Sequence, residues 1–132
     1  MSTQFTTKMY ELDYGRWYEN GHHRIIAILT GLTIQEIVSA SPKKDMWNGQ
    51  VYVKVFRKLG FNVNPKFKKF DPNTQYPCMM RCVRNDIKEP YWYSWVYYDG
   101  FVYEGNNCGW SFDEFLRFMP NFRVTSMLQV WV

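Results

Sequence analysis

The first third of the chain combines short apolar runs with helix stop signals. Residues 24–32 read RIIAILTGL, a compact apolar run with Gly31 near its end. Thr33 and Glu36 then stand at the spacing of a capping box, and the apolar positions that follow share one helical face as far as Pro42. The pattern predicts a helix, a break and a second short helix.

The next segment predicts a third helix followed by a loop. Val51, Val55 and Leu59 recur every four residues, and the cationic side chains between them fall on the outer face. Gly60 suits the left-handed position that ends many helices. Residues 62–77 then hold three prolines and are predicted to form a long irregular loop.

The second half of the chain is strand-like. Residues 78–83 and 92–98 are short runs of apolar, aromatic and β-branched residues. The second run leads into Asp99-Gly100 and then into residues 101–103. Asp-Gly between two such runs is a strong hairpin signal, so an antiparallel pair of strands is expected here.

A short capped helix and a last strand complete the pattern. Ser111 precedes an acidic first turn, which predicts a helix over 112–119 that Pro120 ends. Residues 122–132 are rich in Val, Phe and Trp and are expected to form a strand. The order predicts an α+β fold, with N-terminal helices packed on a C-terminal antiparallel sheet in one domain, 1–132.

The composition supports a compactly folding protein. The chain has 132 residues, of which 20% are aromatic and 21% are charged, so apolar burial can offset the ordering entropy. No run of roughly 18 apolar residues exists, and the polar residues 1–20 are unlike a signal peptide. The chain has three cysteines, Cys78, Cys82 and Cys108. An odd number does not form an even disulfide framework, which favours a reducing cytoplasm. No membrane association, metal or cofactor is expected.

The net charge of +4 is concentrated in one stretch, residues 43–69, where Asp45 is the single acidic residue. Such a basic sector can attract nucleic acid, a nucleotide or an acidic protein surface. A solvated helix face followed by a loop is the alternative interpretation. The cationic residues of the sector are Lys43, Lys44, Lys54, Arg57, Lys58, Lys66, Lys68 and Lys69.

Three runs carry a resemblance to a known family, through their order and spacing: NGHHRIIAILTGLTIQEI, NGQVYVKVFRKLGF and YSWVYYDGFVYEG. Together they resemble small papain-like proteins of phages and mobile elements, which are relatives of the bacteriocin-processing cysteine peptidases. The resemblance covers residues 14–104 and implies a papain-like fold. In such a fold a cysteine at a helix N-terminus acts with a histidine on a facing strand and an acid on the next.

The resemblance places Gly21 at the nucleophile, Tyr93 at the histidine and Glu104 at the acid. A glycine has no nucleophile, and a phenol with a pKa of about 10 is a poor general base at neutral pH. The resemblance therefore implies a non-catalytic, phage-encoded domain that binds a host protein or a small ligand in the host cytoplasm. The former cleft would be lined by Asn20, Gly21, His22, Tyr93, Trp95 and Glu104.

Several polar residues leave alternatives open. His22 and His23 could form a base or metal pair, although neighbours on a helix do not share a face, which favours a polar helix N-terminus. Cys78 and Cys82 lie roughly 13 Å apart along a strand, so half-buried strand positions are favoured over a metal half-site. Cys108 could be an ordinary loop thiol or the nucleophile of a residual cysteine hydrolase.

The aromatic residues of the hairpin fall on both of its faces. Trp92 and its i+2 neighbours face one way, whereas Tyr93, Trp95 and Tyr97 face the other. One face of the hairpin must pack against the helices. The other is either an exposed aromatic surface, suited to a protein or to stacked bases, or an ordinary packed sheet face.

Overall fold

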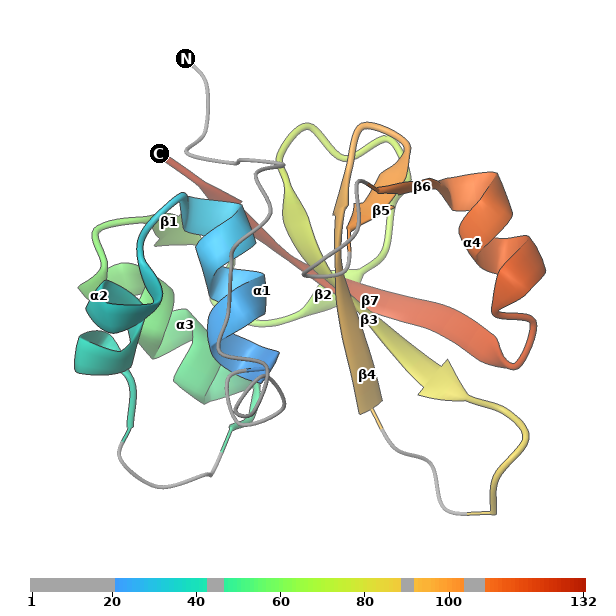
Figure 1. Ribbon diagram of the computed structural model, residues 1–132, viewed down its shortest axis with the longest axis horizontal. Helices are drawn as coiled ribbons and strands as arrows, with labels where there is room; N and C mark the ends of the chain where they lie inside the picture. Colours follow the sequence, from blue (N-terminus) through green and yellow to red (C-terminus); the bar gives the residue numbers. More distant parts are fainter. Residues whose placement is uncertain (1–20, 43–46, 89–91, 104–108) are drawn as a thin grey trace.

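The structure is a computed structural model that describes residues 21–42, 47–88, 92–103 and 109–132. Within them three helices lie on one side of an antiparallel sheet and a fourth lies on the other (Figure 1). The α+β prediction is thereby confirmed. In chain order the elements are α1 (Gly21–Thr30), α2 (Ile34–Ala40), α3 (Gly49–Lys58), β1 (Asn62–Val63), β2 (Lys68–Lys69), β3 (Cys78–Arg84), β4 (Trp92–Tyr98), β5 (Phe101–Tyr103), β6 (Trp110–Ser111), α4 (Phe112–Phe118) and β7 (Phe122–Trp131).

Side-chain caps fix where the helices begin. Thr33 caps α2 in a capping box, in which its hydroxyl accepts from the Glu36 backbone N–H at 3.2 Å. Ser111 forms the same box with Glu114 at the start of α4. Asn48 caps α3 by accepting from the third helical N–H. These bonds satisfy backbone donors that the helix itself leaves unpaired, so short local sequences suffice to set the boundaries.

The β4–β5 hairpin has the predicted turn. Asp99 and Gly100 both have positive φ, 50° and 83°, which is the signature of a type I′ turn. Tyr98 pairs with Phe101 across the turn. Since this turn fixes the register, it also fixes which side chains of β4 face each side of the sheet.

The segment 62–77 is more ordered than the predicted loop. β1 and β2 both pair with β7, which lies between β1 and β3 in the strand order β1-β7-β3-β4-β5-β6. Gln129 of β7 ties the segment down, because its backbone N–H donates to the Asn64 side chain at 2.6 Å and its amide donates to Thr74 at 2.7 Å. The prolines interrupt any continuous strand pattern in the sequence of this segment. In the folded protein, pairing with β7 nevertheless produces two short strands.

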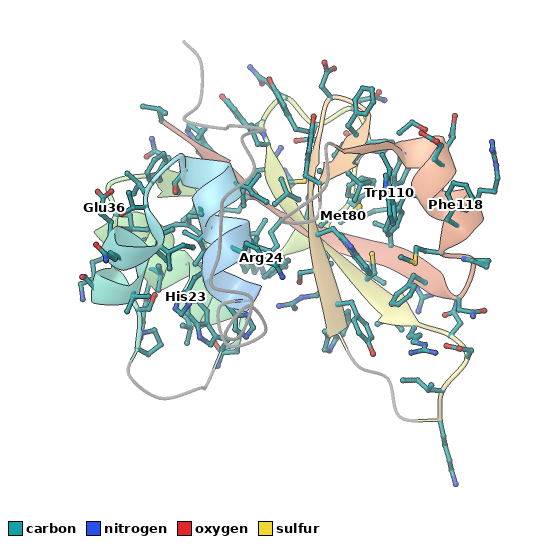
Figure 2. The ribbon with its side chains drawn as sticks, in the orientation of Figure 1. His23, Arg24, Glu36, Met80, Trp110 and Phe118 are labelled. Carbon is teal, nitrogen blue, oxygen red and sulfur yellow. The ribbon has the colours of Figure 1, made fainter. Side chains whose placement is uncertain are left out.

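Each face of the sheet covers a hydrophobic core. On one side Met79, Val96 and Leu128 of the sheet pack against α1–α3; on the other, Met80 and Trp95 pack with α4. Figure 2 shows His23 and Glu36 on the side of α1–α3, and Met80, Trp110 and Phe118 toward α4. The hairpin face that was open to two interpretations is therefore a packed sheet face.

Candidate functional site

The expected cleft centres on the N-terminal end of α1. Gly21 is the first residue of this helix and His22 the second. The helix packs against β3 and β4 and lies beside them in Figure 1. Asn20 and Glu104, also predicted to line the cleft, lie outside the described residues.

The structure does not bring Tyr93 and Trp95 to this end of α1. Tyr93 packs edge-on against Phe122, and Trp95 against Phe115 and Phe122, all on the α4 side of the sheet. Successive strand residues point to opposite faces, so Trp92 is the β4 neighbour that points toward the helices. The predicted grouping of these two aromatics with His22 is corrected accordingly.

A group of rings surrounds His22 instead. The His22 ring stacks on Trp47 with centroids 4.8 Å apart and planes at 14°. Its Nδ1 is hydrogen-bonded to the hydroxyl of Tyr52, a buried residue near the start of α3. His23 meets the edge of Trp47 at 5.7 Å. The two adjacent histidines thus contact one tryptophan, and His22 is held by rings and a hydroxyl.

Arg81 is a charged residue of the sheet that acts electrostatically on Tyr52. It occupies the middle of β3, and its guanidinium lies 3.7 Å from the Phe67 ring centroid and 5.2 Å from that of Trp92. Its Nε is buried and has no hydrogen-bond acceptor among the residues that the structure describes. The sequence signal for this residue is a single arginine within the otherwise apolar run CMMRCV. The site predicted from the sequence did not include it.

Burial shifts the acid–base behaviour of this group. Desolvation raises the pKa of Tyr52 well above its ordinary value, and the positive charge of Arg81 acts in the opposite direction. Desolvation likewise lowers the pKa of Arg81, opposed by Tyr52. The phenol therefore stays protonated at neutral pH and the guanidinium stays charged. Tyr52 is buried and already bonded to His22, so Arg81 is the member of this pair whose charge suits the binding of an acceptor.

The basic sector is spread over separate elements. Lys54, Arg57 and Lys58 are exposed along α3, whereas Lys66 is exposed in the loop before β2 and β2 itself consists of Lys68 and Lys69. The β2 lysines line an open pocket of 620 Å³ beside β7. Lys43 and Lys44 lie outside the described residues.

Neither described thiol is suited to nucleophilic chemistry. Cys78 and Cys82 are fully buried and face the α4 side of the sheet. Burial raises the pKa of Cys82 to about 12 and that of Cys78 further still, so both are protonated at neutral pH. Cys108 lies outside the described residues, among which no cluster of three or more potential metal ligands is found.

The buried thiols predict a loss of stability at alkaline pH. A thiol in the unfolded chain titrates near a pKa of about 8.5, whereas Cys82 in the folded protein keeps its proton to about 12. Above pH 8.5 the unfolded state binds fewer protons, so the free energy of unfolding falls by about 1.4 kcal/mol per pH unit for each buried thiol.

Guanidinium unfolding from pH 7.5 to 10 measures this slope. Replacing Cys82 by alanine removes one of the two titrating groups, so the variant's stability is expected to fall less steeply with pH than that of the wild type. The comparison of slopes is independent of the cost of the substitution itself. Parallel pH profiles for the two proteins would contradict the prediction.

Comparison with known proteins gives no relative for this arrangement. No protein-family profile, curated protein or solved structure matches the chain. Within the described part of the chain, no helix is both long and apolar enough to cross a membrane. The fold is that of an α+β protein, and its candidate site is the cluster of His22, Trp47 and Tyr52 at the N-terminal end of α1.

Proposed function

We propose that this protein is a non-catalytic binding domain with a papain-like arrangement, and that its ligand binds at the N-terminal end of α1. The observation that carries the proposal is the hydrogen bond between His22 and Tyr52 at this point, with the positive charge of Arg81 near enough to act on the pKa of Tyr52. A papain-like peptidase holds its nucleophilic cysteine here, and Gly21 offers none. The polar and aromatic side chains at this position then serve to bind a ligand, with no reaction to perform.

Two features support binding over catalysis. The described thiols are buried on the opposite side of the sheet, so neither can replace the missing nucleophile. Trp92, by contrast, is 59% exposed beside Arg81, although large apolar side chains are mostly covered in this fold. Exposed tryptophans next to a cation are frequent anchors of protein interfaces. With a phage origin, the partner would be a host protein.

Capture from a bacterial lysate tests this function. Immobilised wild-type protein is expected to retain one stoichiometric protein after nuclease treatment. Replacing Trp92 by alanine is expected to lower this capture about tenfold or more, because interface tryptophans commonly carry a large share of the binding free energy. The measurement is the bound amount per immobilised protein.

Phe118 provides the matched control, because it is a 64% exposed aromatic residue on α4, across the sheet from α1. Phe118→Ala should leave capture unchanged. Equal losses in both variants would contradict a site at α1. Capture that nuclease abolishes would instead favour the second function, nucleic-acid binding through the exposed cationic residues of α3.

A further inference from the structure

Two arginines of β3 differ sharply in their surroundings. Arg84 forms a bidentate pair with Asp86, in which Nε donates at 2.6 Å and Nη2 at 2.9 Å. Arg81, three residues earlier and on the opposite face of the sheet, forms no such pair with any described acidic residue, and its buried Nε has no acceptor. One arginine is thus satisfied by a carboxylate and the other is not.

The aromatic rings beside Arg81 do not satisfy its donors. Phe67 and Trp92 contact the guanidinium as cation–π partners, which stabilises its charge. The N–H groups lie in the plane of the guanidinium and need acceptors there. Arg81 as a whole is only half-buried, so an external acceptor at its solvent-facing part would offset the desolvation cost of the cation.

The backbone of the sheet is irregular at this residue. The register between β3 and β7 shifts between Arg81 and Cys82, and Thr125 is the extra residue of this bulge. The Thr125 hydroxyl donates to the Arg81 carbonyl at 3.1 Å. Bulges change the direction of neighbouring side chains and are frequent beside binding sites. The irregularity thus coincides with the arginine of β3 that pairs with no acid in the described part of the chain.

We propose that Arg81 binds a carboxylate of a peptide ligand, with Trp92 packing against the side chain next to that carboxylate. The inference rests on the proposed function and names its ligand chemistry. A planar carboxylate matches the in-plane donors of a guanidinium, and its charge is opposite to that of Arg81. The exposed face of Trp92 marks the side from which a ligand can approach.

Three dipeptide probes test the carboxylate requirement on the wild-type protein. The first is acetylated glycyl-phenylalanine with a free C-terminus, and the second is its C-terminal amide. The third is the same amide with glutamate in place of glycine, which offers a side-chain carboxylate instead. Phenyl phosphate serves as the tetrahedral anion. Binding is measured by calorimetry, and the Nε–H resonance of Arg81 is followed by NMR.

At least one carboxylate probe is expected to bind about tenfold or more tightly than the uncharged amide and to shift the Arg81 resonance. The stronger of the two identifies the source as a C-terminus or an acidic side chain. Arg81→Lys keeps the charge but removes the planar fork, so it should abolish this preference, whereas Arg84→Lys should preserve it.

Several outcomes overturn the inference. These are equal affinity for amide and carboxylate, tighter binding of phenyl phosphate, no binding of any probe, or equal effects of the two arginine substitutions. The probes could bind equally with and without a carboxylate, yet fail to bind the Trp92→Ala variant. That result would support the proposed function and reject Arg81 as the residue that binds the carboxylate. The wild-type comparison needs no variant, so misfolding of Arg81→Lys cannot obscure it.

Discussion

Replacing Phe115 by alanine is expected to lower the free energy of unfolding by about 3–5 kcal/mol. Phe115 is fully buried and packs α4 into the core on this side of the sheet. Its ring lies 5.0 Å from that of Trp95 and also meets Trp110 and Phe112. Alanine would leave a cavity that these large rings cannot readily fill, and both the lost burial and the cavity are destabilising.

The control is on the same helix. Phe118 has the same side chain but is 64% exposed, so Phe118→Ala should change stability by no more than about 0.5 kcal/mol. Urea unfolding followed by circular dichroism gives both values. Similar losses for the two substitutions would mean that α4 does not cover the sheet through Phe115.

Replacing Phe56 by alanine is expected to cost a similar amount, about 3–5 kcal/mol, in the core on the other side of the sheet. Phe56 is fully buried in α3 and belongs to the cluster formed by α1–α3 and the sheet. Because small domains have only about 5–15 kcal/mol of stability, this loss would unfold a substantial fraction of the protein on mild heating.

The neighbouring residue supplies the comparison for α3. Arg57 is exposed, so Arg57→Ala should leave the unfolding midpoint almost unchanged. Phe56→Ala should also weaken ligand binding at elevated temperature, because α3 carries Tyr52 to the site. A melting temperature that falls equally in both variants would contradict the assignment of Phe56 to the core.

The sequence predicted the elements whose causes are local. Thr33 with Glu36, and Ser111 before its acidic turn, gave helix starts that the structure reproduces. Asp99-Gly100 gave the hairpin turn. In each case the deciding interaction joins residues within about four positions of one another, so the residues concerned are adjacent in the sequence.

The candidate site was only partly predictable. His22 was placed in the site by the resemblance to papain-like proteins, but Trp47, Tyr52 and Arg81 were not included. His22 and Tyr52 are 30 residues apart, and only the tertiary arrangement of α1 and α3 brings them into contact. The prediction for Tyr93 was wrong for another reason. Side chains alternate between the two faces of a strand, so an error of one residue in matching the sequence to the family pattern puts Tyr93 on the wrong face of the sheet.

The sequence by itself determined the helix boundaries, the hairpin turn and most strand limits, because caps, turns and side-chain periodicity act over short distances. Tertiary structure decided the rest. It paired β1 and β2 with β7, covered the Trp95 face with α4, and placed Arg81 beside Phe67 and Trp92. These contacts join residues far apart in the chain, and the burial of apolar surface that selects them is non-directional, so no local pattern specifies the partner.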